Sequence, residues 1–98
     1  MSLPVRLSAC AQHDVEDTAA WYEGQRVGLG ERFVTALDRL IDRVSENPQQ
    51  FPVIETVVRR ALVRRFPYAV YFIVSSDHIA VIAVLHVRRY PQEWQRRR

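Results

Sequence analysis

The first residues alternate between apolar and polar side chains. Val5, Leu7 and Ala9 are apolar, and Arg6 and Ser8 stand between them. A period of two places the apolar side chains on one face of a strand and the polar ones on the other. The chain is therefore expected to begin with a short β-strand.

The next stretch, residues 11–25, has the spacing of a helix. Either Ser8 or Gln12 leads into it. Its early acidic residues suit the positive end of the helix dipole; they are Asp14, Glu16 and Asp17. Its apolar residues fall four and three positions apart, which predicts one stripe on the helix surface; they are Val15, Ala19 and Tyr22.

A second helix follows after a glycine-rich turn. Its apolar residues keep the helical repeat over about four turns; they are Leu29, Phe33, Leu37, Leu40, Ile41 and Val44. The helix should end at Asn47-Pro48, because the residue before a proline avoids the helical region of backbone conformation. Two helices joined by a short loop predict an antiparallel helical hairpin.

The remaining chain predicts three strands, at residues 57–65, 68–75 and 79–87. The last of them is almost wholly apolar, as expected of a central strand that is covered on both faces. The predicted order is therefore β-α-α-β-β-β. This is an α+β fold in which a helical hairpin covers one face of a small antiparallel-type sheet. We expect residues 1–98 to form a single domain.

Charge divides the chain into two unlike parts. All fourteen basic residues are arginine; residues 1–55 hold five of them against nine acids, a net charge of −4. Residues 56–98 hold nine arginines against two acids, a net charge of +7. Clustered positive charge attracts a polyanion or an acidic protein segment, and the guanidinium group grips phosphate or carboxylate in a bidentate manner. Some of these arginines are expected only to solvate the surface.

Several classes of protein are not expected from this composition. Cys10 is the only cysteine, so an intramolecular disulfide is impossible, and neither Cys10 nor the three histidines have zinc-type spacing. We expect no metal and no cofactor. No apolar run approaches the roughly 20 residues that span a bilayer, and the first residues do not have the pattern of a signal peptide. The expectation is a cytoplasmic protein that does not contact membranes.

Five short strings are spread over nearly the whole chain. They are Asp14…Trp21-Tyr22, Phe33…Leu37…Leu40, Asn47-Pro48…Phe51-Pro52, Arg65-Phe66-Pro67-Tyr68…Tyr71-Phe72 and Leu85-His86-Val87-Arg88-Arg89-Tyr90-Pro91-Gln92-Glu93-Trp94. With the predicted order of elements, they resemble the RelE/ParE superfamily of toxins from type II toxin–antitoxin systems. They look most like its ParE-type plasmid-stabilisation branch.

The resemblance implies one of two activities. RelE-like members cut mRNA at the ribosome with lysines, arginines and a tyrosine, whereas ParE-like members inhibit DNA gyrase and lack that set. This sequence has no lysine, and Ala69 stands where RNA-cleaving relatives often carry a strand arginine. Inhibition of gyrase by binding is therefore the preferred hypothesis. The alternatives are a ribosome-dependent mRNA endonuclease and a non-toxic basic module that binds nucleic acid or an acidic peptide.

Candidate functional residues follow from the chemistry of each hypothesis. For a nuclease, His86 would be the acid or base, and Arg65 and Arg89 would hold the phosphate; otherwise His86 is a partly buried residue that ends a strand. The residues expected to contact a target or an antitoxin are Arg60, Arg64, Arg65, Arg88, Arg89, Trp21 and Trp94. Trp94, or Tyr90, also stands near the C-terminal aromatic position of the relatives, although Trp94 would equally pack back on the sheet.

The resemblance also implies a partner. A cognate antitoxin lays an extended segment and a helix over toxins of this superfamily, so we expect a complex between the two proteins. Acidic side chains of the antitoxin would neutralise the arginines of this chain. An exposed strand edge and a groove between helices are the surfaces suited to such segments.

Overall fold

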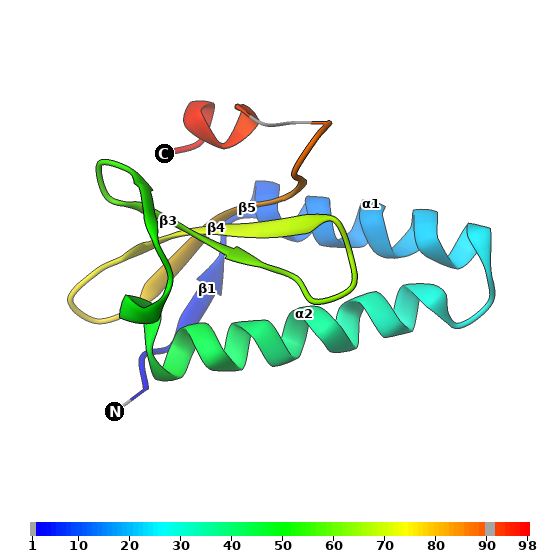
Figure 1. Ribbon diagram of the computed structural model, residues 1–98, viewed down its shortest axis with the longest axis horizontal. Helices are drawn as coiled ribbons and strands as arrows, with labels where there is room; N and C mark the ends of the chain where they lie inside the picture. Colours follow the sequence, from blue (N-terminus) through cyan, green and yellow to red (C-terminus); the bar gives the residue numbers. More distant parts are fainter. Residues whose placement is uncertain (1, 90–91) are drawn as a thin grey trace.

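The computed structural model describes residues 2–89 and 92–98, and its sheet carries helices on one face (Figure 1). The elements, in chain order, are β1 (Val5–Leu7), α1 (Ala9–Gln25), α2 (Leu29–Glu46), the short 3-10 helix η1 (Pro48–Gln50), β2 (Val53–Glu55), β3 (Val58–Leu62), β4 (Tyr68–Val74), β5 (Ile79–His86) and the 3-10 helix η2 (Glu93–Arg96). This confirms the predicted α+β class and the helical hairpin.

The five strands form one mixed sheet in the order β1-β5-β4-β3-β2. The strands from β2 to β5 form an antiparallel meander, and the last of them returns beside β1. There β5 runs parallel to β1, with Val5 opposite Ile79 and Leu7 opposite Val81. The sheet is therefore antiparallel except at this one pair of strands.

The structure adds the short strand β2 to the predicted order. It has three residues and pairs with β3 through a bulge, and Thr56 in the loop between them has a positive φ of 49°. The strand predicted at residues 57–65 is also shorter, because β3 ends at Leu62. Arg65 lies in the turn to β4 with a φ of 70°, a left-handed conformation that a strand does not contain.

Helix α1 begins at Ala9, because the Ser8 side chain caps it. The Ser8 hydroxyl accepts a hydrogen bond from the Ala11 N–H at 3.0 Å, which satisfies one of the free amides of the first turn. The prediction of Ser8 as a leading residue is thus confirmed, and Gln12 lies inside the helix. Asp14 consequently lies beyond the first turn, so it is not a residue that stabilises the helix end.

The two helices approach closely at the turn between them. The Glu23 carboxylate accepts hydrogen bonds from the N–H groups of Gly28 and Gly30, at 2.8 and 3.1 Å, and so caps the start of α2. A Cβ atom at Gly30 would lie only 2.4 Å from the Ala19 carbonyl oxygen. The glycine is therefore required by the contact between the helices.

Apolar side chains pack on both faces of the sheet. One core lies between the sheet and the helices and includes Phe33, Leu37 and Phe72, which are almost fully buried. The other lies on the opposite face, where η2 covers the sheet (Figure 1). There the Trp94 ring stacks on Tyr71 with centroids 5.5 Å apart, and Trp94 is only 6% exposed.

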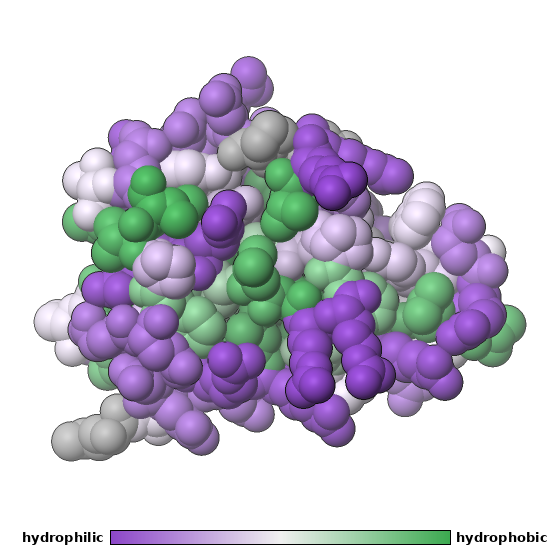
Figure 2. Space-filling view, in the orientation of Figure 1, coloured by the Kyte–Doolittle hydropathy of each residue, from purple (hydrophilic) through white to green (hydrophobic). Residues whose placement is uncertain are grey.

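The face of the molecule shown in Figure 2 is mostly polar, with a few apolar side chains exposed. Apolar side chains gather at the end of the molecule that carries the loop between β2 and β3 (Figure 2), where Val53 and Val57 are 47% and 55% exposed. No helix among the described residues is both long enough and apolar enough to cross a bilayer.

Candidate functional site

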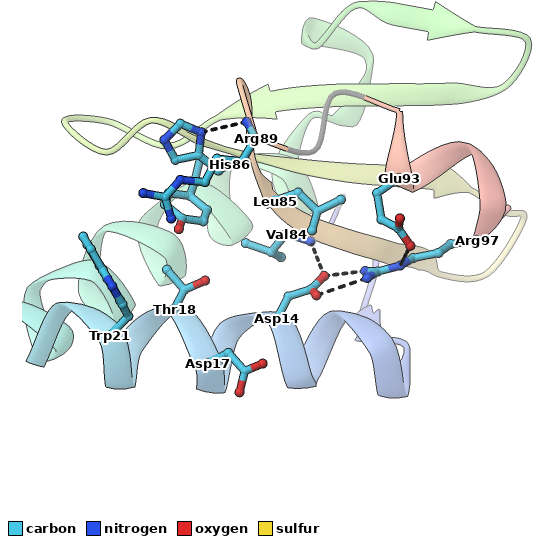
Figure 3. Close-up of a pocket in the computed structure, with 11 residues that line it drawn as sticks. Asp14, Asp17, Thr18, Trp21, Val84, Leu85, His86, Arg89, Glu93 and Arg97 are labelled. Carbon is cyan, nitrogen blue, oxygen red and sulfur yellow. Dashed lines mark hydrogen bonds and ion pairs between the residues drawn. The ribbon is translucent and has the colours of Figure 1, made fainter. Parts of the chain in front are cut away.

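A groove of about 340 Å³ lies between α1 and the end of β5 (Figure 3). Helix α1 supplies one wall, β5 lies behind it, and the C-terminal segment closes one end. The lining residues are Asp14, Asp17, Thr18, Trp21, Tyr68, Val84, Leu85, His86, Arg89, Glu93 and Arg97. The groove thus combines three residues singled out in the sequence, namely Trp21, His86 and Arg89, with others that were not.

His86 ends β5 and has its ring fixed by the backbone that follows. Its Nδ1 atom accepts hydrogen bonds from the N–H groups of Arg88 and Arg89, at 3.1 and 3.3 Å. The neutral ring therefore carries its proton on Nε2. Burial lowers the pKa of His86, and the nearby charges of Arg89 and Arg88 lower it further. At neutral pH this histidine is an uncharged donor, packed edge-on against Tyr68.

Arg89 is exposed and lies against an aromatic ring of α1. Its guanidinium carbon is 5.7 Å from the centre of the Trp21 ring, which is a cation–π distance. Trp21 is 48% exposed, so both side chains remain available to a partner. Arg88 is also exposed. The His86 end of the groove is therefore cationic and aromatic.

An ion pair occupies the other end of the groove. The Arg97 guanidinium holds both oxygens of the Asp14 carboxylate, at 2.5 and 3.3 Å. The same carboxylate accepts a hydrogen bond from the Val84 N–H at 3.0 Å (Figure 3). The hydrogen bond to Asp14 raises the pKa of Arg97 above its ordinary value. With side chains only 12% and 18% exposed, this pair is better shielded from solvent than an ordinary surface salt bridge.

The other arginines of interest lie outside the groove. Arg64 and Arg65 are exposed in the turn between β3 and β4. That turn approaches the end of β5, where the Val87 N–H donates to the Pro67 carbonyl at 3.0 Å. Arg60 lies directly opposite Tyr71 in the sheet, on the face covered by η2. Arg60 is thus separated from Arg64 and Arg65 in the turn after β3 and from Arg88 and Arg89 after β5.

Trp94 is part of the second core rather than of an exposed surface. Beside it, burial raises the pKa of Tyr71, whereas the charge and hydrogen bonding of Arg60 lower it. Of the two alternatives for Trp94, the structure has the one in which it packs back on the sheet. Tyr90, the other candidate for the C-terminal aromatic position, lies outside the described residues.

Sequence reasoning missed the Asp14–Arg97 pair. The two residues are 83 positions apart, and Asp14 is 70 positions from the amide it caps. Neither separation along the sequence produces a periodic pattern. The signals that the sequence did contain were an aspartate inside the first helix and a run of arginines at residues 96–98.

Within residues 2–89 and 92–98, no three side chains of the metal-ligating types come together. Ala69 is fully buried in β4. The groove presents Arg89, the exposed indole ring of Trp21 and the neutral imidazole of His86 at one end, and Asp14, Glu93 and Arg97 at the other.

Comparisons with known proteins show the family and the fold of this chain. A family model described as "ParE toxin of type II toxin-antitoxin system, parDE" matches residues 5–91. A search of curated proteins gives no match. A solved structure described as "Chromosomal ParDE TA system from P. aeruginosa" has the same fold, with a TM-score of 0.76. It is 15% identical, and the match covers 87% of this chain and 96% of the other.

Proposed function

Because that family model spans most of the chain, the protein belongs to the ParE family of toxins from type II toxin–antitoxin systems, and we propose that it acts by binding and inhibiting DNA gyrase. It is the toxin component of such a system, and its activity is countered by an antitoxin. We place this action in the cytoplasm, where the DNA that gyrase supercoils is found.

The observation that supports inhibition by binding is the cationic surface at the end of β5. Arg88 and Arg89 follow the strand and are exposed, and the turn that carries Arg64 and Arg65 is hydrogen-bonded to the same strand exit. None of the ion pairs among the described residues uses any of these four arginines. Their charge is therefore available to an acidic surface.

The groove supports cleavage of RNA less well. An endonuclease of this kind needs an acid, a base and a cation at the phosphate. His86 is the one histidine in the groove, and its Nδ1 atom is already engaged by two backbone amides. Arg65, the second proposed phosphate ligand, is not among the residues that line the groove.

The same cationic surface is suited to the antitoxin. An acidic segment of the antitoxin that lies over Arg88 and Arg89 would also cover Trp21, which offers apolar area beside the charges. Binding there would prevent the toxin from reaching its target. Neutralisation would then be competition for one surface.

Induced expression tests the proposal. Expressed alone, the protein should arrest bacterial growth with DNA-damage signalling before bulk mRNA falls, and co-expression of its antitoxin should restore growth. Codon-phased mRNA cleavage in arrested cells would favour the endonuclease instead. Normal growth of cells that are confirmed to express the soluble protein would exclude both toxic activities. The remaining hypothesis would be a non-toxic binding module.

A further inference from the structure

Aromatic rings form a row from α1 to the end of β5. The ring centroids of Trp21 and Tyr22 lie 5.1 Å apart, and Tyr22 lies 6.0 Å from Tyr68. Tyr68 in turn lies 5.3 Å from His86. The two tyrosines pack against the core, where both contact Phe33. The exposed Trp21 ring at the end of this row is therefore held by packed neighbours.

Arg89 adds a second planar group at the exposed end of the row. Its guanidinium carbon lies 5.7 Å from the centre of the Trp21 ring, and both side chains are exposed (Figure 3). An indole ring and a guanidinium group both stack on the flat face of a nucleobase. A carboxylate has no such face, so an acidic side chain would use only the charge of the pair. The pair therefore fits an unpaired base better than it fits an acidic side chain.

Three further arginines supply positive charge on the segments around this pair. Arg88 precedes Arg89 at the exit of β5, and Arg64 and Arg65 lie in the turn before β4. A backbone hydrogen bond of 3.0 Å joins that turn to the exit of β5. Guanidinium groups bind phosphate in a bidentate manner. The two segments therefore supply the cations that a chain of phosphates needs.

Carboxylates limit where such a chain of phosphates can lie. Asp14 and Glu93 lie at the Arg97 end of the groove (Figure 3), and Asp17 lies one helical turn from Trp21 toward that end. Like charges repel, so phosphates are excluded from this part of the groove. The favoured path leads from Trp21 over the exit of β5 to the turn before β4.

We propose that the protein binds single-stranded DNA along this path. One base stacks on Trp21 and Arg89, and the phosphates are held by Arg88, Arg64 and Arg65. A single strand is favoured over a duplex because only an unpaired base presents its face to an aromatic ring. The proposal goes beyond inhibition of gyrase, since the toxin itself contacts the nucleic acid. It rests on the proposed function in one respect, which is that gyrase acts on DNA rather than on RNA.

A defined oligonucleotide tests the site directly. The probe is a fluorescein-labelled oligothymidylate of about 12 nucleotides, a length within the range of single-strand binding sites. Its binding to the full-length toxin is measured by fluorescence anisotropy. The matched control is an abasic strand with the same number of phosphates. We expect the abasic strand to bind at least about fivefold more weakly, which is the lower limit for the loss of one stacked base.

The dependence of binding on salt measures how many phosphates the arginines hold. With four arginines engaged, the logarithm of the binding constant should fall against the logarithm of the salt concentration with a slope of about −3, because each phosphate contact on a single strand adds about −0.7. The double variant Arg88→Ala/Arg89→Ala should have a slope of about −1.4. Arg39→Ala, on exposed α2 surface, should keep the slope of the wild type.

Variants of Trp21 separate stacking from attraction between charges. Trp21→Ala should remove the preference for oligothymidylate over the abasic strand, because the abasic strand has no base to stack. Trp21→Phe should retain the preference, since a phenyl ring also stacks on a base. If Trp21 only supported the structure, Trp21→Ala would weaken the binding of both strands equally.

The proposal is wrong if the toxin at about 100 µM binds no oligothymidylate at low salt, or if the abasic strand binds equally well. It is also overturned if a duplex of the same length, oligouridylate or a polyglutamate peptide binds more tightly than oligothymidylate. Those three results would indicate duplex DNA, RNA or an acidic protein as the ligand. None of these outcomes decides whether gyrase is inhibited, because supercoiling is measured separately. Conversely, binding of oligothymidylate would stand even if gyrase proved not to be the target.

Discussion

Gly30 lies where α1 and α2 come closest, and its lack of a side chain is what allows the approach. Gly30→Ala should destabilise the protein by about 1–3 kcal/mol, because the new methyl group would overlap the Ala19 carbonyl oxygen. Gly24→Ala is the matched control, since nothing lies within 4 Å of a Cβ atom there. That change should stabilise α1 by roughly 0.5–1 kcal/mol. Urea unfolding of both variants measures the difference, and equal stabilities would contradict the close packing.

For individual residues, the sequence predicted only some of those that line the groove. Trp21, His86 and Arg89 were all candidates, and they do meet. Each ends or borders an apolar element, so their placement followed from the elements themselves. The ion pair of Asp14 with Arg97 depends on the path of the chain after β5, which no local pattern determines.

Among the elements, the C-terminal segment has the clearest structural role. It passes over the face of the sheet opposite α1 and α2 and is held at both sides. Arg97 binds Asp14 next to β5, and Gln95 and Arg98 contact Glu55 in β2 at 2.9 and 3.0 Å. Trp94 lies between these contacts on Tyr71. The segment thereby covers apolar side chains that would otherwise face solvent.

The two tryptophans provide a matched pair for testing this role. Trp94→Ala should cost about 3 kcal/mol of unfolding free energy, because it empties a buried site. Trp21→Ala, at a half-exposed position, should cost less than about 1 kcal/mol. Chemical denaturation followed by circular dichroism gives both values. A Trp94→Ala protein as stable as Trp21→Ala would show that the segment does not hold the second core.

The elements also show where pattern analysis is limited. Both helices and the long strands β4 and β5 were predicted, because a helical spacing or a run of apolar residues extends over many positions. Strand β2 was missed because three residues between Pro52 and Thr56 are too short for a period of two to appear. The parallel pairing of β1 with β5 joins residues more than 70 positions apart, and it is set by the packing of the hairpin between them.

For the whole molecule, the unequal distribution of charge predicts how the antitoxin binds. Association should be fast at low salt and slow as ionic strength rises, because attraction between exposed charges is screened beyond about 10 Å at 0.1 M salt. Arg65→Ala and Arg89→Ala should lower the association rate constant, and Trp21→Ala should mainly raise the dissociation rate constant. Kinetics at low and high salt would measure both. An association rate that does not depend on salt would contradict the electrostatic account.

The central claim is that this ParE-family toxin acts by binding gyrase through the cationic end of β5. The most direct measurement is the supercoiling of relaxed plasmid by purified gyrase with increasing amounts of the toxin. The account predicts that the wild-type protein inhibits supercoiling and that the double variant Arg88→Ala/Arg89→Ala inhibits at least tenfold less, while Arg39→Ala, on exposed α2 surface, matches the wild type. Full supercoiling in the presence of saturating, folded wild-type toxin would contradict it.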